Sequence, residues 1–440
     1  MSSMIELTPN SIDVVDEVEI EAMLRAFSEA EMDRWLSNLD LDQTIRLHRS
    51  RYHPIYLNLL SVFYERLPIE RIREISAECT RASIWSHRSV HYYMAKIPYW
   101  SQDELAQSIR IRLDESQIET IESLLGLGKG LILSSFRIGL YSFVPTDLAL
   151  SGYKVWTPLQ EGKYRAMQTD LKRLRALTWP AGTEKAQNIK LLNVLNAEDS
   201  GAVFRLARAL KRGEIVLMYP DGNSGLDGPW GDKSRTEVDF LGFRLSVKDG
   251  AARLAGFGGT PILPLIAVTD SGRAKVVLGP PLVPVVKGTQ SSDDYATRTM
   301  QELYSFLESF ALEFPEQWEA CASLHRWRRQ SPGAADLVEP TTLHSETAEI
   351  RALLEQGKRL RINEQNGIVE LAAKESEIWI DVKTLRSVKS PQWASDIFRA
   401  LSSRDGIDLS WLNKYKALAD PDAIWSLLAR LRMRDLIGVA

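Results

Sequence analysis

The chain has 440 residues, too many for a single ordinary core, so two or three domains are expected. A hydrophobic fraction of 44% and a charged fraction of 25% are normal for a globular protein. The formal net charge of −4 argues against a general nucleic-acid binder, which would carry a basic excess. Two cysteines, Cys79 and Cys321, exclude a disulfide framework and fit a reducing compartment.

The first residues are acidic and lack the basic-then-apolar pattern of a signal peptide. No stretch approaches the roughly 18 apolar residues that a membrane helix needs. The sequence therefore predicts a cytoplasmic protein without a membrane span of its own.

The first part of the chain, residues 1–110, is predicted to be helical. Apolar residues recur at three- and four-residue spacing over 17–39 and 54–81, with charged residues between them. Residues 114–125 (DESQIETIESLL) predict a further helix with acidic residues in its first turn, ended by Gly126 or Gly128.

Strands and helices alternate from residue 128 to about residue 285. The predicted strands are 130–136, 153–156, 189–192, 214–219, 260–266 and 273–278. The predicted helices are 139–151, 164–177, 202–211 and 250–255, with a closing helix over 295–314. This alternation implies an α/β domain over 111–330 with a mostly parallel central sheet.

Residues 331–347 are rich in Pro, Ser, Thr and Gly and are typical of a linker. A small α+β module follows over 348–440, with strands at 368–371 and 377–380 and helices at 391–401, 409–418 and 421–432. Its helices, followed by a short apolar strand, resemble a winged-helix unit of the kind found in peptide-recognition modules. Such a unit could bind a protein or peptide partner by adding a strand, or it could serve as a packing domain.

The most informative stretch is 219–265. Tyr219-Pro220-Asp221-Gly222 puts a carboxylate on a tight turn just past a strand end, where parallel sheets bind ligands, although a plain turn explains the same residues. The following glycine-rich loop, closed by Phe240-Leu241-Gly242, is long enough to be functional. Lys248 precedes a helix whose N-terminal amides could face an anion, and an ordinary amphipathic helix explains it equally well.

The order of these motifs resembles the lysophospholipid acyltransferase superfamily, and most closely its lipid A late acyltransferase branch. The resemblance is carried by 214–222 (GEIVLMYPDG), 240–242 (FLG), 250–255 (GAARLA) and 261–264 (PILP). The helix and strand at 118–133 and the closing residues 315–318 (PEQW) and 324–327 (LHRW) extend it to about 110–330. The resemblance implies an acyltransferase-like α/β fold without a cofactor or a metal.

In that superfamily a His and, five positions later, an Asp or Glu lie where the first strand turns into its helix. The His is the general base and the carboxylate holds its tautomer. Here the His position falls on Phe136 or Arg137, and the carboxylate position on Tyr141 or Ser142. Arg137 stays protonated and cannot act as a base, so it either holds an anionic group of a ligand or pairs with Asp221.

Of the six histidines, His87 and His91 lie four residues apart on a predicted helix and project from one face. They lack the third ligand of a zinc site, and ordinary helix histidines are the simpler interpretation. His325 belongs to the closing motif and is interpreted as structural.

Two functions remain open. The first is a soluble acyltransferase-like enzyme that works without the usual His base and takes its acyl group from coenzyme A, a carrier protein or another activated carrier. Its acceptor would be an amine, hydroxylamine or hydroxyl. The second is an inactive relative that binds a ligand or partner. We predict Asp221 and Arg137 as catalytic residues; the predicted substrate-binding residues are Ser135, Phe136, Tyr141, Tyr219, Asn223, Arg244 and Lys248.

Overall fold

The structure, a computed structural model, describes most of the chain. The described residues are 40–41, 43–44, 48–176, 184–222, 235–284, 292–328, 340–362, 368–372, 377–381, 387–390, 392–403, 405–415, 421–433 and 436–439. The chain forms two compact units, Met1–Arg329 and Gln330–Ala440. No helix within the described ranges is long and apolar enough to cross a membrane.

The first unit begins with helices, as its sequence predicts. The predicted helix over 54–81 is two helices, α4 (Arg49–Phe63) and α5 (Ile69–Lys96). The break falls at Pro68, whose extended backbone precedes the first turn of α5. The segment 17–39 lies outside the described residues. A short turn η1 (Ile97–Tyr99) leads to α6 (Gln102–Ser108).

The next helix, α7 (Glu115–Leu125), confirms the predicted helix over 114–125. Asp114 caps it by accepting from the backbone N–H of Gln117, whose side chain accepts in return from the Asp114 N–H. This capping box satisfies amides that have no partner in the first turn.

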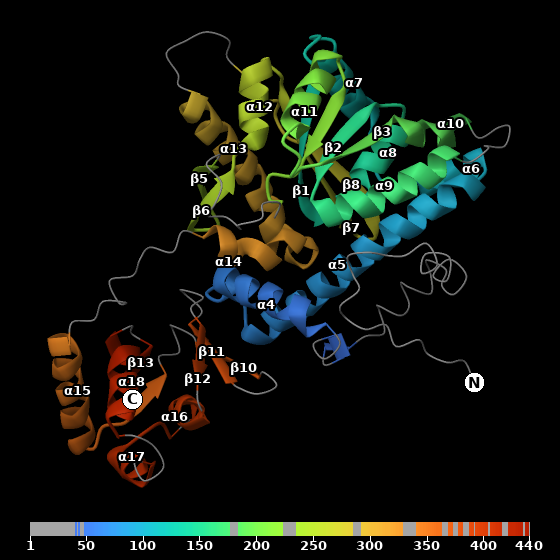
Figure 1. Cartoon of the computed structure of the whole chain (residues 1–440). Coiled ribbons are helices and arrows are strands. Elements are labelled where there is room, and N and C mark those ends of the chain that lie inside the picture. The colour runs from blue at the N-terminus through green and yellow to red at the C-terminus, as the bar shows by residue number, and fades with distance from the viewer. Residues whose placement is uncertain are drawn as a thin grey trace, which may run out of the picture. The chain divides into compact units, whose positions relative to one another are not determined.

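A six-stranded sheet follows, in the order β3-β2-β4-β1-β7-β8 (Figure 1). Its strands are β1 (Leu131–Gly139), β2 (Val155–Leu159), β3 (Leu192–Asn196), β4 (Ile215–Met218), β7 (Ile262–Asp270) and β8 (Arg273–Leu278). All neighbouring pairs are parallel except β7 and β8. The predicted α/β class with a mostly parallel sheet is therefore confirmed.

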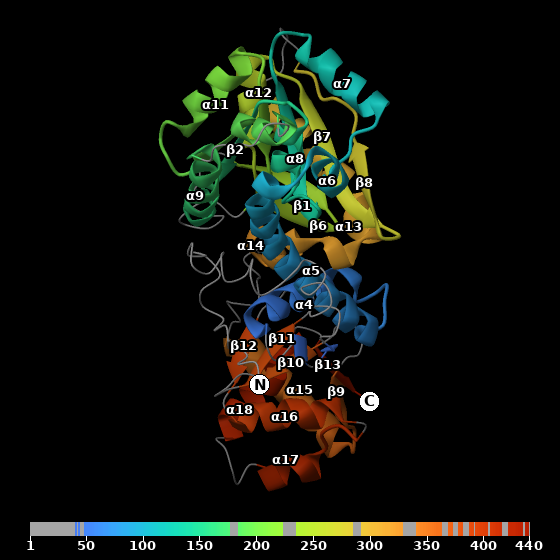
Figure 2. The same cartoon turned by 90° about the vertical axis from the view of Figure 1, so that its right-hand side faces the viewer.

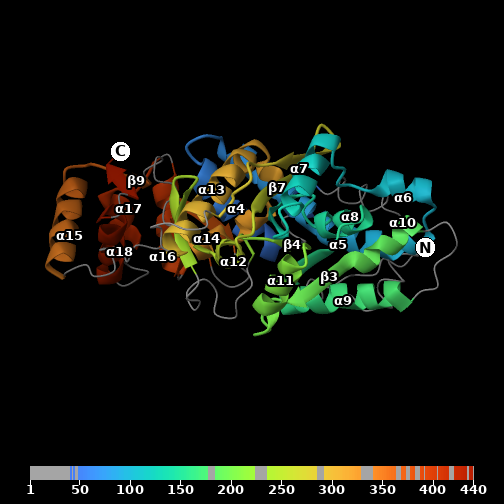
Figure 3. The ribbon, with the colours of Figure 1, turned by 90° about the horizontal axis from the view of Figure 1, so that it is seen from above.

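Helices cover both faces of this sheet. Leu131 and Leu133 of β1 join a buried cluster with residues of α5, α7, α8 (Val144–Leu150) and α9 (Glu161–Ala176). Ile132, between them, is also fully buried and faces the other side, because side chains alternate along a strand. The helices α11 (Ala202–Lys211), α12 (Gly250–Gly258) and α13 (Ser292–Glu313) pack on that second side. Figures 2 and 3 show these layers from two further directions.

Three local predictions are wrong. The strand β1 runs on to Gly139, and the helix predicted over 139–151 begins only at Val144. The segment predicted as a strand over 189–192 is a 3-10 turn, η2 (Asn188–Leu191), with β3 directly after it. The loop predicted between Gly222 and Gly242 contains β5 (Arg235–Phe240), which pairs with β6 (Phe243–Lys248) in a hairpin.

The hairpin has a local cause. Leu241 and Gly242 both take positive φ angles, 53° and 79°, as the tight turn between two antiparallel strands requires. After α13 the chain forms η4 (Pro315–Gln317), η5 (Glu319–Ser323) and α14 (Leu324–Trp327).

The second unit has its own core of buried side chains, including Ile350, Phe398, Trp425 and Leu428. The predicted strands and helices are present as β10 (Ile368–Ala372), β11 (Glu377–Asp381), α16 (Gln392–Ser402), α17 (Leu409–Tyr415) and α18 (Pro421–Met433). The structure adds α15 (Pro340–Glu355), β9 (Leu360–Ile362), β12 (Ser387–Ser390) and β13 (Ile437–Val439). Because α15 begins at Pro340, the last part of the predicted linker is helical.

Candidate functional site

Arg137 and Asp221 pair at the carboxyl edge of the sheet. The backbone N–H of Arg137 donates to Asp221 Oδ2 (2.7 Å), and its guanidinium donates to the backbone carbonyl of Asp221 (2.6 Å). Arg137 Nε lies 3.8 Å from Asp221 Oδ1, and the two side chains are only 14% and 1% exposed. Of the two roles the sequence left open for Arg137, the structure shows the pairing with Asp221.

This pair exists because two neighbouring strands end at different points. The pairing of β1 with β4 stops at Ser134 and Met218, whereas β1 continues alone to Gly139. The chain after β4 turns back, with Gly222 N–H donating to Tyr219 O (3.0 Å), and this turn carries the Asp221 carboxylate to β1. Arg137 therefore lies within the strand, and the predicted strand-to-helix corner at this residue is wrong.

Glu319 forms a second buried polar centre. Its Oε2 accepts from the Tyr141 hydroxyl (2.8 Å), and its Oε1 lies 3.2 Å from His87 Nε2. Tyr219 donates through its hydroxyl to the Tyr141 carbonyl (2.9 Å), and the two rings pack edge to face. The centre thus joins α5, η5, the segment after β1 and the turn after β4.

A third pair repeats this chemistry one turn along α5. His91 Nδ1 lies 2.9 Å from Asp170 Oδ2 on α9, and the Asp170 side chain is 2% exposed. Arg173 approaches the same carboxylate at 3.9 Å. The predicted helix that carries His87 and His91 is present as α5, and the two histidines contact different elements from it. Figure 3 shows α9 running alongside α5.

Burial and charge set the protonation of these groups. Burial raises the pKa of Asp221 to about 6, although the Arg137 charge and backbone N–H oppose the shift. Burial would raise the pKa of Glu319 too, but His87, Lys163 and Arg137 hold it well below its ordinary value. Burial lowers the pKa of His87 against the opposing effect of Glu319, so its imidazole is neutral near pH 7.

The buried phenol of Tyr141 stays protonated, because burial and the Glu319 charge raise its pKa well above the ordinary value. The arrangement is therefore a neutral imidazole against a carboxylate, with a phenol donor on the second carboxylate oxygen. A neutral imidazole oriented by a carboxylate is an arrangement that can accept a proton. The His87 side chain is 25% exposed.

The structure places the other predicted residues differently. Ser135 and Phe136 are fully buried, and the Phe136 ring packs against Tyr304. The Arg244 side chain, 62% exposed, pairs with Glu237 across the β5–β6 hairpin. Lys248 ends β6 opposite Arg235, and Asn223 lies outside the described residues. The substrate contacts predicted for these residues stay predictions.

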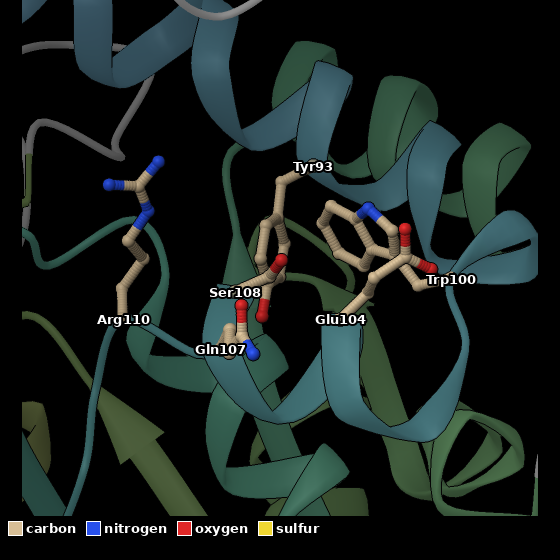
Figure 4. Close-up of a pocket in the computed structure, with 6 residues that line it drawn as sticks. All are labelled: Tyr93, Trp100, Glu104, Gln107, Ser108 and Arg110. Atoms are coloured by element: carbon tan, nitrogen blue, oxygen red, sulfur yellow. The ribbon is translucent and has the colours of Figure 1, made fainter.

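Two hollows lie elsewhere in the first unit. Figure 4 shows one of about 300 Å³, lined by Tyr93, Trp100, Glu104, Gln107, Ser108 and Arg110. A second, of about 610 Å³, lies between α6, α7 and the start of β2. Neither hollow is lined by a residue of the Arg137–Asp221, His87–Glu319 or His91–Asp170 pairs. The Tyr93 hydroxyl donates to the buried carboxylate of Asp147 (2.6 Å), whose pKa burial raises to about 7.

Asp147 has a structural role. Its other oxygen accepts from the backbone N–H groups of Arg110 and Ile111, at 2.9 and 2.8 Å. These bonds hold the segment before α7 against α8. Burial is the largest cause of the raised pKa of Asp147, and the carboxyl is fully enclosed.

Cys79 and Cys321 are both buried free thiols, with sulfur atoms 3.9 Å apart. Among the described residues no group of three or more His, Cys, Asp or Glu side chains could hold a metal ion. The Asn58 side-chain amide donates to His325 Nδ1 (3.0 Å between Nδ2 and Nδ1), which joins α4 to α14. This contact agrees with its structural interpretation.

Sequence reasoning missed Glu319. The residue lies one position after the closing motif 315–318, and its partner His87 precedes it by 232 residues. No spacing rule joins residues so far apart; the only available signal was the polar spacing of His87 and His91 on one helix face. A comparison of the sequence with protein-family models finds no match, and a comparison with characterised proteins finds none either.

Proposed function

We propose that this chain is an acyltransferase-like enzyme. It would transfer an acyl group from a thioester or another activated donor, held by coenzyme A, a carrier protein or another acyl carrier, to an amine, hydroxylamine or hydroxyl. The observation that carries the proposal is the His87–Glu319–Tyr141 arrangement at the carboxyl edge of a parallel sheet, where such sheets bind their ligands. The motif order that resembles the acyltransferase superfamily supports the reaction class.

The proposed chemistry compensates for the missing motif histidine. His87 takes the proton of the acceptor as the acceptor attacks the acyl carbon. Glu319 holds the imidazole through Nε2 and stabilises the imidazolium that forms, and Tyr141 fixes the carboxylate from its other side. Arg137 and Asp221 hold the end of β1 on the turn after β4, so they position Tyr141 and Tyr219.

The test measures transfer from an acyl thioester to a series of amines, by release of free thiol. His87→Ala should lower kcat/KM by about 10²- to 10⁴-fold, the usual contribution of a general base. The loss should be smallest for hydroxylamine, a nucleophile that needs little help, and added imidazole should restore part of the rate.

His344→Ala is the matched control, because His344 is an exposed histidine on α15. Its kcat/KM should equal that of the unaltered protein. Full activity of His87→Ala with every acceptor would remove His87 from the mechanism.

A second candidate function has one observation in its favour. Arg137 and Asp221, both predicted to be catalytic, are buried against each other as an ion pair. Such a contact would fit a scaffold that is retained without catalytic turnover. In that case the protein would bind a ligand through the first unit and a protein or peptide through the second. An affinity capture with residues 345–440 that recovers no partner would count against it.

A further inference from the structure

We propose that His91 and Asp170 form a second proton-transfer pair, which donates a proton to the leaving group, and that the natural acyl donor includes oxygen esters. The inference rests on the proposed function, because it names the group that protonates the leaving group in the same reaction. It begins from a repeated arrangement. Two histidines on one face of α5, one turn apart, each contact a buried carboxylate from a different element.

The repetition has a geometric basis. Residues four apart on a helix have Cβ atoms about 5–6 Å apart, so His87 and His91 leave α5 as neighbours, one toward Glu319 and the other toward Asp170. Their side chains are 25% and 22% exposed, whereas those of Glu319 and Asp170 are 11% and 2% exposed. Each pair therefore presents an accessible ring in front of an enclosed carboxylate.

The His91 pair has the geometry of a proton donor. Nδ1 lies 2.9 Å from Asp170 Oδ2, so Nε2 is the ring nitrogen that Asp170 does not engage. A carboxylate on Nδ1 fixes the tautomer and stabilises the protonated ring. Arg173 also reaches Asp170, at 3.9 Å, and holds the carboxylate in place.

The need for such a group depends on the donor. A thiolate leaves without help, because thiols have a pKa of about 8.5. The alkoxide of an ester is far more basic and leaves slowly unless it is protonated as the C–O bond breaks. A second proton-transfer pair would help a donor with an oxygen leaving group far more than a thioester, so we connect it with such donors.

The steps balance. His87 takes the proton of the acceptor while the new bond to the acyl carbon forms. The tetrahedral intermediate then collapses, the C–O bond breaks, and protonated His91 gives its proton to the departing oxygen as an alcohol. One proton has moved from acceptor to leaving group, and its transfer from His87 back to His91 through solvent restores the starting state.

The experiment varies the leaving group with one acyl chain and one amine acceptor. The donors are the 4-nitrophenyl, phenyl and trifluoroethyl esters and the thioester. The variant is His91→Gln, whose amide can still donate to Asp170 and so keeps the contact between α5 and α9. His91→Ala is the second variant, and circular dichroism checks the fold of both.

We expect the two variants to match the unaltered protein with the thioester and the 4-nitrophenyl ester. With the trifluoroethyl ester, kcat/KM should fall by about 10²- to 10⁴-fold. An equal loss across all four donors, or no loss with any, overturns the proposal, because a structural tether would not discriminate between leaving groups. If the unaltered protein transfers from none of the donors, the proposed function fails and this inference with it.

Discussion

At the scale of single residues, Arg137 and Asp221 show how a buried pair can join two parts of a sheet. Removing two charges from water is costly, and hydrogen bonds to the same groups offset part of that cost. The backbone N–H of Arg137 donates to the Asp221 carboxylate, and its guanidinium donates to the Asp221 backbone carbonyl. These bonds tie β1 to the turn after β4.

Breaking this pair from one side should be costly. Arg137→Met leaves the buried Asp221 carboxylate unpaired and should lower the free energy of unfolding by about 3–5 kcal/mol. Urea unfolding followed by tryptophan fluorescence measures it. Combining Arg137→Met with Asp221→Asn should cost less than the sum of the single changes, because neither charge is then left alone.

The control is Arg165→Met, which removes an exposed arginine from an ion pair with Glu161 on α9. Exposed pairs contribute little, so its unfolding curve should overlay that of the unaltered protein. A loss at Arg137 no larger than at Arg165 would contradict the assignment.

Sequence reasoning at this scale had a clear limit. It could name Arg137 and Asp221 and state the pairing as one of two alternatives, because the two residues follow neighbouring strands of one sheet. It could not find Glu319, since the closing segment of the domain returns to α5 only in three dimensions. Local sequence patterns predict helices and strands, but they do not show which distant helices and strands pack against each other.

At the scale of elements, the extension of β1 depends on Gly139. This glycine has φ of +61°, and its backbone pairs with Ala267 after an irregularity in the β1–β7 register. A Cβ at this position would lie 2.3 Å from the Ala267 carbonyl oxygen. Only glycine fits, because the conformation is left-handed and the neighbouring strand is too close.

A pair of glycine substitutions separates the cost of the left-handed backbone from the cost of the close approach to β7. Gly139→Ala should destabilise the protein by about 2–5 kcal/mol, from backbone strain and from the clash together. Gly128→Ala has a similar φ, +70°, with no atom within 4 Å of the added Cβ, so it should cost only about 1–2 kcal/mol. Thermal unfolding of both variants measures the difference, and equal losses would show that the close approach to β7 is unimportant.

The end of β1 is misplaced in the sequence prediction by three residues. The pattern predicts a strand over 130–136 and a helix from 139, whereas β1 runs to Gly139 and α8 begins at Val144. The serines Ser134 and Ser135 are fully buried within the strand, as that prediction has them. Arg137 and Gly139 look like the start of a turn in the sequence, because their contacts with Asp221 and with β7 form only in the folded sheet.

At the scale of the whole molecule, the two units have separate cores. The buried cluster around Ile350, Phe398 and Trp425 draws all of its residues from the second unit. A unit with its own core can fold alone. The composition of 331–347 predicted a boundary near this place without showing that α15 begins at Pro340.

We therefore expect the fragments 1–329 and 330–440 to unfold cooperatively when produced separately. The thermal unfolding curve of the full chain should equal the sum of the two fragment curves, as measured by calorimetry. A fall of more than about 5 °C in the midpoint of the 330–440 fragment, roughly 1 kcal/mol for a domain of about 100 residues, would contradict this expectation.

The separation of His87 from Glu319 has a consequence for synthesis. The histidine leaves the ribosome before any strand of the sheet, and its carboxylate follows only after the last one. A polypeptide that stops anywhere between them carries His87 without Glu319. If His87 is the base that we propose, chains that have not finished their central domain would lack the carboxylate that orients it.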